Sequence, residues 1–160
     1  MTLRKATFLD KIGSLIPNYL GYSVRSEMRN TEKQFRDEIS ILIRNAETKI
    51  VSFQKQLISC NEIILCQQWE ISRKLINTLY SQIKNASYGE SPFFAENQIK
   101  DEELEIIYKY DLEISERVAL ISKTVESEID EPLSAGFIKQ QVIAIDSIII
   151  DRTNFINRFK

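Results

Sequence analysis

Apolar residues recur at intervals of three and four along most of this chain. The first long stripe consists of Phe35, Ile39, Leu42, Ala46, Ile50, Phe53 and Leu57. This period is that of a helix that buries one face. With Ser23 as a possible cap, the pattern predicts a helix from residue 23 to about 58. A helix several times the average length is typical of a bundle or a coiled coil.

Three further stripes have the same period and follow in order along the chain. One runs from Asn61 to about Asn85 and contains Leu65, Trp69, Arg73, Ile76, Tyr80 and Ile83. The next begins at Asp101, a predicted N-cap, and contains Leu104, Ile107, Asp111, Ile114, Val118, Ile121 and Val125. The last begins near Pro132 and contains Ile138, Val142, Ile145, Ile149, Arg152, Ile156 and Phe159. No segment alternates as a strand would.

A shorter apolar pattern precedes these stripes at the N-terminus. Residues 3–15 predict an amphipathic helix, which Pro17 and Gly21 end, and residues 16–22 form a linker. The favoured interpretation is that Phe8, Ile12 and Leu15 cover one end of the bundle. The alternative is that the segment docks on a membrane surface or a partner, aided by Arg4, Lys5 and Lys11.

The predicted fold is therefore all-α: an antiparallel four-helix bundle of long helices with a short N-terminal helical appendage. Residues 1–22 form the amphipathic helix and linker, and residues 23–160 form the bundle as a single domain. A chain of 160 residues is long enough to bury a stable core without cross-links.

The charges are unevenly placed, although the net charge is only −2. Residues 1–55 carry ten Lys/Arg and six Asp/Glu, whereas residues 90–131 carry four and thirteen. The favoured interpretation is intramolecular, with an acidic helix lying beside basic ones. The alternative is two surfaces for two partners. A sequence pI near 5.4 argues against sequence-specific binding of nucleic acid.

The residues that most catalytic and metal sites require are scarce. There is no histidine in the chain, and Cys60 and Cys66 are too far apart for a Cys-x-x-Cys motif. We expect both cysteines to be buried small apolar residues in a reducing compartment. A site made only of Glu102, Glu105, Glu113 and Glu116 is conceivable, but a solvated face is favoured. We predict no catalytic residue, no cofactor and no metal.

Charged residues occupy some stripe positions where a core side chain is expected, and Asp111 and Arg73 are the sharpest cases. Asp111 lies between Ile107 and Ile114, and Arg73 lies between Trp69 and Ile76. A buried charge is costly unless it is paired. We therefore predict that Arg73 and Asp111 meet across the bundle as a structural ion pair; the alternative is that both reach solvent.

Two sets of residues are candidates for binding a partner. Arg25, Arg29, Lys33 and Arg36 form a basic ridge on the second helix, interrupted by acidic residues and by a predicted Glu32–Arg36 pair. The other candidates are aromatic residues of the linker and of the loop at 87–94, namely Tyr19, Tyr22, Phe93 and Phe94. A salt-bridged face and tucked-in aromatic plugs are the alternatives.

Two motifs resemble those of an uncharacterised family of small bacterial helical proteins. One is Ile16-Pro17-Asn18-Tyr19-Leu20-Gly21-Tyr22, before a charged helix. The other is a Tyr88-Gly89 loop with aromatics, followed by Asp101-Glu102-Glu103-Leu104 and Tyr108-Lys109-Tyr110-Asp111. Asn18 stands where that family has Gly, and Tyr110 where it has Phe. The resemblance implies an all-helical fold and supplies no activity.

These observations favour a non-enzymatic interaction protein, an adaptor or scaffold that binds another protein. The second hypothesis is a peripheral membrane-associated factor that binds through its amphipathic N-terminus. An enzyme with a carboxylate metal site is the third and least favoured. Self-association is compatible with helices this long. The chain has no apolar run of the roughly 20 residues that a membrane span needs, so we expect a cytoplasmic protein, or one peripheral to the inner face of a membrane.

Overall fold

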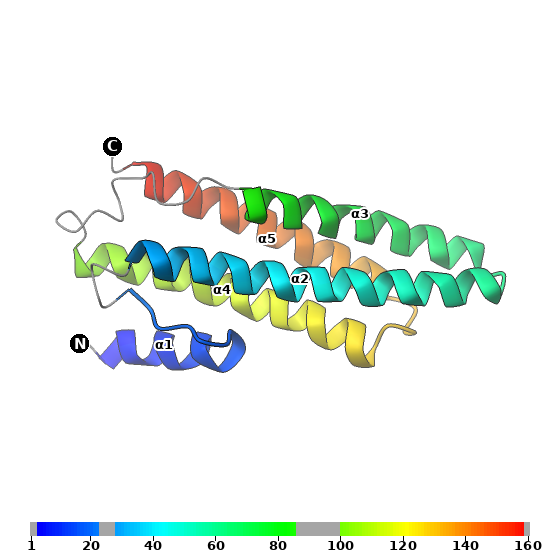
Figure 1. The fold of residues 1–160 in the computed structure, drawn as a ribbon, viewed down its shortest axis with the longest axis horizontal. Coiled ribbons are helices and arrows are strands. Elements are labelled where there is room, and N and C mark those ends of the chain that lie inside the picture. Colours follow the sequence, from blue (N-terminus) through cyan, green and yellow to red (C-terminus); the bar gives the residue numbers. More distant parts are fainter. Residues whose placement is uncertain (1–2, 23–27, 86–99, 159–160) are drawn as a thin grey trace.

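A computed structural model describes residues 3–22, 28–85 and 100–158, which form helices and no strand (Figure 1). The five helices are α1 (Leu3–Leu15), α2 (Met28–Ser59), α3 (Ile63–Asn85), α4 (Asp101–Ser127) and α5 (Ser134–Asn157). The predicted all-α bundle with an N-terminal appendage is confirmed.

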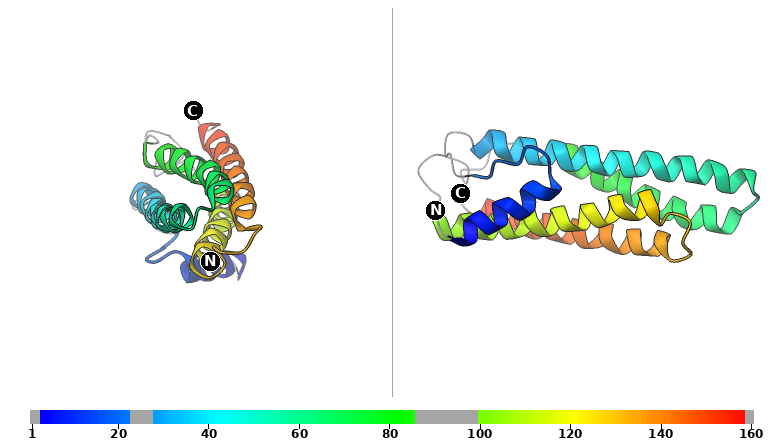
Figure 2. Two further views of the ribbon diagram at one scale, coloured as in Figure 1. Left: turned by 90° about the vertical axis from the view of Figure 1, so that its right-hand side faces the viewer. Right: turned by 90° about the horizontal axis from the view of Figure 1, so that it is seen from below.

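The four long helices form two antiparallel hairpins, α2–α3 and α4–α5, which pack side by side (Figures 1 and 2). Between the hairpins, α2 lies beside α4 and α3 lies beside α5. Helix direction alternates along the chain, so these two neighbouring pairs run in the same direction. Consecutive helices are therefore antiparallel, as predicted, whereas the neighbouring helices of different hairpins are parallel.

Most of the core comes from the predicted stripes, but Ile43, Leu79 and Ile148 are buried off them, whereas the stripe residues Leu42, Tyr80 and Ile149 are only half-buried. Residues that are at most 1% exposed come from all four long helices, among them Ile39, Ile43, Ile50, Trp69, Ile76, Ile107, Val118, Ile121, Ile138 and Ile145. Trp69 packs edge-to-face on Phe53, with ring centroids 5.8 Å apart. The buried stripes explain why helices of 23 to 32 residues are stable here, because packing of the apolar faces contributes more than helix propensity.

A tight turn joins α2 to α3. Asn61 adopts the left-handed conformation (φ 61°), the Glu62 amide donates to the Leu57 carbonyl at 2.8 Å, and the Asn61 amide donates to the Ile58 carbonyl at 3.1 Å. This is the Schellman arrangement that ends a helix. Because α2 is long, the tip of the α2–α3 hairpin projects beyond the turn between α4 and α5 (Figures 1 and 2).

The appendage α1 lies along α4, as the favoured interpretation of the N-terminal segment requires, although it covers a flank rather than an end of the bundle (Figure 1). Ile12 and Ile16 are fully buried there. In the linker, Gly21 has φ 72°, and a Cβ atom on it would lie 2.2 Å from Leu9 Cδ2 and 2.9 Å from the Tyr108 hydroxyl. Only glycine therefore fits at this position.

Three predicted helix starts differ from the structure. Helix α3 begins at Ile63 rather than at Asn61, which lies in the preceding turn. Lys100, and not Asp101, is the N-cap of α4, and the Glu103 carboxylate accepts the Lys100 amide at 2.8 Å. Helix α5 begins at Ser134, whereas Pro132 lies in the preceding turn. The predicted start of the second helix at residue 23 and the aromatic loop at 87–94 lie outside the described residues.

Candidate functional site

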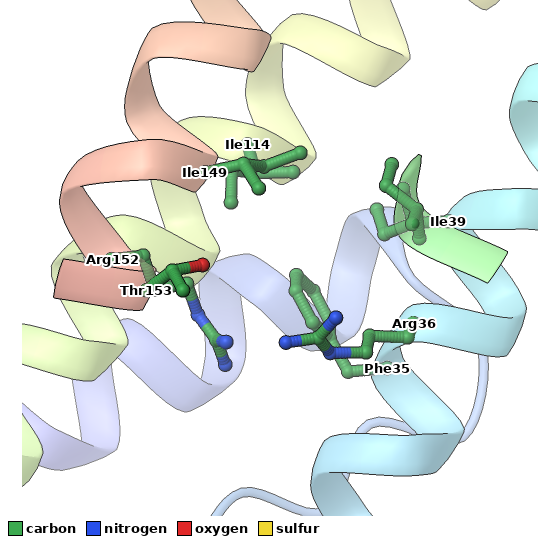
Figure 3. A pocket seen from close by; sticks show the side chains of 8 residues that line it. Phe35, Arg36, Ile39, Ile114, Ile149, Arg152 and Thr153 are labelled. Carbon is green, nitrogen blue, oxygen red and sulfur yellow. The ribbon is translucent and has the colours of Figure 1, made fainter. Parts of the chain in front are cut away.

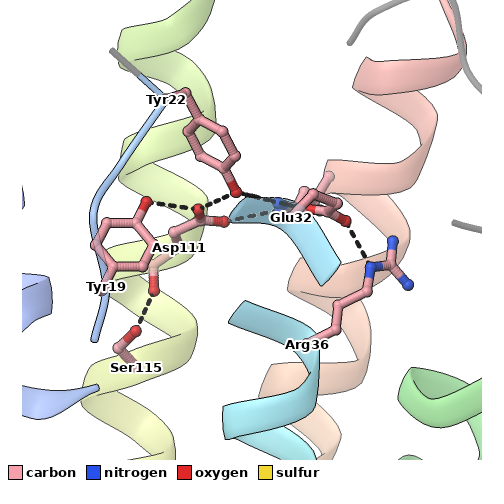
Figure 4. Close-up of polar contacts among 7 residues, drawn as sticks. Tyr19, Tyr22, Glu32, Arg36, Asp111 and Ser115 are labelled. Carbon is pink, nitrogen blue, oxygen red and sulfur yellow. Dashed lines mark hydrogen bonds and ion pairs between the residues drawn. The ribbon is translucent and has the colours of Figure 1, made fainter. Parts of the chain in front are cut away.

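A buried carboxylate, Asp111 of α4, is the centre of a polar network near the end of the bundle where the linker docks (Figure 4). Its Oδ2 accepts hydrogen bonds from the hydroxyls of Tyr19 (2.9 Å) and Tyr22 (2.8 Å), both in the linker. Its Oδ1 accepts a bond from Arg152 Nε of α5 at 2.8 Å. The Tyr22 amide also donates to the Tyr108 hydroxyl at 2.6 Å. The network therefore attaches the linker to the bundle.

A second carboxylate, Glu32 of α2, completes the network. Arg152 binds it through both terminal nitrogens, with Nη1 at 3.0 Å from Oε1, and Arg36 Nε lies 2.5 Å from Oε1. Arg152 Nη2 also donates to the Tyr22 hydroxyl at 3.1 Å. The relative exposures of the Asp111, Glu32 and Arg152 side chains are 0%, 2% and 4%. Two carboxylates and two guanidinium groups balance in charge, which is the condition for burying them.

The two carboxyl groups respond differently to this environment. Burial raises the pKa of Glu32, but the attraction of Arg152 and Arg36 outweighs it and lowers that pKa to about 2. Burial raises the pKa of Asp111, and Arg152 only partly offsets the increase because Glu32 acts in the same direction as burial. Burial and the Asp111 charge raise the pKa of both Tyr19 and Tyr22 well above the ordinary value. The hydroxyls therefore stay protonated and act as donors.

The predicted Arg73–Asp111 pair is wrong, because the two residues have other partners. Asp111 binds Arg152, whereas Arg73 of α3 binds Glu70 (2.6 Å) and Glu47 (3.3 Å). Helices α3 and α4 lie on a diagonal of the bundle, and Arg73 faces the seam between α2 and α3. The apolar stripes predicted charges in the core at Asp111 and Arg152. The sequence alone does not show which residues of different helices lie at the same height in the bundle.

The partner-binding residues that we predicted are only partly on the surface. Arg29 and Lys33 are exposed, but Arg36 turns inward to Glu32, which confirms the predicted Glu32–Arg36 pair. Tyr22 is fully buried, and Tyr19 packs on Phe35 with ring centroids 5.6 Å apart. Their hydroxyls hold the linker instead of facing a partner. Arg25, Phe93 and Phe94 lie outside the described residues.

A pocket adjoins the network between the helices (Figure 3). Its cavity volume is about 20 Å³, which is room for about one water molecule, and it is lined by Phe35, Arg36, Ile39, Ile83, Ile114, Ile149, Arg152 and Thr153. Arg152 of α5 and Arg36 of α2 extend their guanidinium groups toward each other from opposite sides of the pocket, and Ile149 and Ile39 lie beside them (Figure 3). Because Arg152 already holds Glu32 and Asp111, an anion entering the pocket would compete with these carboxylates.

The opposite end of the molecule carries an apolar groove along the seam of the α2–α3 tip. Val51, Gln54, Lys55 and Ile58 of α2 line it together with Ile63, Cys66, Gln67 and Glu70 of α3. Ile58 is 59% exposed and Ile63 46%, and the neighbouring Ile64, which does not line the groove, is 76% exposed. The sequence analysis did not predict this site. Ile58, Ile63 and Ile64 lie off the apolar stripes, but nothing in the sequence indicates whether they are exposed or buried.

The cysteines differ from the prediction. Cys60, at the tip, is exposed, and Cys66 is half-buried in the groove; both are free thiols. Cys60 is therefore not a core residue, because the turn that contains it projects into solvent.

Among residues 3–22, 28–85 and 100–158, no group of three or more His, Cys, Asp or Glu side chains is arranged to hold a metal ion. None of the helices in that part of the chain is both long and apolar enough to cross a membrane.

Comparisons with known proteins give no relative for this chain. No family model matches it, and neither curated proteins nor solved structures give a match. The function is therefore inferred from the geometry of two sites, the Asp111 network and the tip groove.

Proposed function

We propose that this chain is a non-enzymatic protein-interaction bundle, an adaptor or scaffold, which binds through the groove at the tip of the α2–α3 hairpin. The observation that carries the proposal is the exposure of Ile58 and Ile63 beside each other on a part of the hairpin that projects from the bundle. Contiguous exposed apolar side chains are uncommon on monomers and mark interaction surfaces.

The other candidate surfaces support binding less well. In the basic ridge, Arg36 is committed to Glu32, so the described part offers only Arg29 and Lys33. The apolar side of α1 lies against α4, with Ile12 fully buried, so binding of a membrane through it would first require the linker to leave Asp111. The tip groove needs no such rearrangement.

A cytoplasmic location remains part of the proposal. The mixed charges of the surface and the two free thiols, one of them exposed at the tip, fit a reducing compartment. A chain with an exposed free thiol would form unwanted disulfides in an oxidising one.

The test is affinity capture from the native host with three baits: the unaltered chain, Ile63→Lys and Ile64→Lys. The two variants place the same charge at adjacent positions, but only residue 63 lines the groove. We expect a stoichiometric partner that is lost with Ile63→Lys and kept with Ile64→Lys. A partner that survives Ile63→Lys would contradict binding through the groove.

A further inference from the structure

The charged side chains that flank the apolar groove have opposite signs on its two sides. Lys55 lies on the α2 side of the groove and Glu70 on the α3 side, and Ile58, Ile63 and Cys66 belong to its lining. A surface that carries both signs on opposite sides of an apolar strip is able to complement a copy of itself. A partner of one charge would gain from only one side.

The heights of these residues along α2 and α3 follow from the contacts between the two helices. The Gln54 side chain donates to the Cys66 carbonyl at 3.4 Å and to the Glu70 carboxylate at 2.9 Å. Residues 54 and 55 of α2 therefore lie level with residues 66–70 of α3. Ile58 and Ile63 likewise lie level with each other, because each is within three residues of Asn61 in the turn.

These levels define how two grooves would fit face to face. A two-fold axis that runs along the seam, within the interface, places α2 of one copy opposite α3 of the other. Lys55 of each copy then lies opposite Glu70 of the other, and Ile58 lies opposite Ile63. The interface repeats each contact twice, as isologous interfaces do. The Glu70 carboxylate accepts bonds from Arg73 and Gln54, and a carboxylate has acceptor sites left for a lysine.

We propose that the occupant of the tip groove is a second copy of this chain, so that two α2–α3 tips form a four-helix dimer contact with reciprocal Lys55–Glu70 pairs. This inference rests on the proposed function, since it names the partner of the same groove. The groove spans only a few turns of each helix, so the contact is small. Small interfaces are transient, and we expect a dissociation constant on the order of micromolar.

The experiment is sedimentation velocity of the full chain over a concentration series from about 1 µM to several hundred micromolar. We expect a monomer–dimer equilibrium. In Ile63→Lys the dissociation constant should rise about tenfold or more, because the two Ile58–Ile63 contacts are replaced by two charges buried in the dimer. Ile64→Lys, one residue away, should associate like the unaltered chain. Circular dichroism of each variant shows that the helices are intact.

Charge variants test the geometry of the contact independently. Lys55→Glu should weaken self-association, and Glu70→Lys should do the same, because each places like charges opposite each other twice. An equimolar mixture of the two variants should associate again, because every pair in the mixed dimer has opposite signs. If Glu70→Lys fails to fold, self-association of Lys55→Glu is measured alone at low and high salt. It should be weaker at low salt than at high salt, because repulsion between exposed charges is screened by salt.

Thiol accessibility gives a second readout. In the Cys60→Ser variant the remaining Cys66 lines the groove, and its rate of reaction with a maleimide should fall as the concentration rises. In Cys66→Ser, the exposed Cys60 at the end of the turn serves as the control, with a rate that changes less.

The outcomes separate this inference from the function on which it rests. A dimer lost in Ile63→Lys supports both. A monomer at all concentrations overturns the second copy as occupant; if that monomer still captures another protein through residue 63, the proposed function stands. A monomer that captures nothing overturns both. A dimer that survives Ile63→Lys but not Ile64→Lys also overturns the inference.

Discussion

The two ends of this bundle distribute polar and apolar side chains in opposite ways. Where the linker docks, Asp111 and Glu32 are buried, and the buried Arg152 binds both of them. At the α2–α3 tip, Ile58 and Ile63 are exposed to solvent. Each end contains a feature that lowers stability, because burying charge and exposing apolar surface are both unfavourable.

The difference teaches what each end does. The charges at the linker end are satisfied within the chain, so they fix the position of α1, the linker and three helices relative to one another. The isoleucines at the tip, in contrast, remain exposed to solvent in the folded chain. We therefore assign structure to the network and binding to the tip.

The largest effect is expected from Arg152→Met. This change leaves Glu32 and Asp111 buried without their shared cation, and breaking a buried pair from one side costs about 3–5 kcal/mol. Urea denaturation measures the free energy of unfolding. The control is Arg73→Met in the half-exposed pair at the α2–α3 seam, where a loss of about 1 kcal/mol or less is expected. Equal losses in the two variants would contradict the distinction between them.

The next effect is a pH dependence that belongs to Glu32. Its pKa in the folded chain is about 2, below the ordinary 4.5, so its contribution to stability is present above pH 4.5 and is lost as the pH falls toward 2. The shift corresponds to about 3 kcal/mol. Relative to the unaltered chain, Glu32→Gln should be destabilised at pH 7, and the difference should shrink below pH 4.5.

Asp111 provides the matched control for this pH series. Its pKa is raised, so its contribution to stability is largest at low pH and falls as the pH rises through that pKa. The difference between the unaltered chain and Asp111→Asn should therefore change with pH in the sense opposite to that of Glu32→Gln. Parallel curves for the two variants would show that the carboxyl groups are not held in different environments.

A smaller loss is expected when the linker loses one hydroxyl. Tyr22→Phe removes a buried donor to Asp111 and an acceptor for Arg152, which corresponds to about 1–3 kcal/mol. Tyr19→Phe removes one bond from a less buried ring and should cost less. Both should increase cleavage of the linker in limited proteolysis. If Tyr19→Phe has the larger effect on both measurements, Tyr22 is not the main attachment.

The helices and their buried faces could be predicted from the sequence because the apolar period is local information. The stripe of α4 predicted Ile107, Ile114 and Val118 as core residues, and all three are buried. The same stripe identified Asp111 as a charge in the core. Choosing its partner needed the order of helices around the bundle, which depends on contacts between residues distant in sequence.

Glu32 shows the same limit at a finer level. It lies three residues before Phe35 and seven before Ile39, on the buried face of α2, but its spacing to Arg36 also fits a surface pair. The pair with Arg36 was predicted, and the bond to Arg152, 120 residues away, was not. The tip groove could not be predicted either, because it exists only where one hairpin is longer than the other.

The smallest effect on stability is expected at the tip, from Ile63→Lys. Ile63 is 46% exposed, and a substitution on the surface changes the free energy of unfolding by about 0.5 kcal/mol or less. Its control at the other end is Ile114→Lys, which places a charge at a position 2% exposed and should prevent stable folding. Urea denaturation at a concentration where the chain is monomeric compares them. If Ile63→Lys lowers the stability of the monomer by more than about 2 kcal/mol, the isoleucines at the tip belong to the core, and the contrast between the two ends of the bundle does not hold.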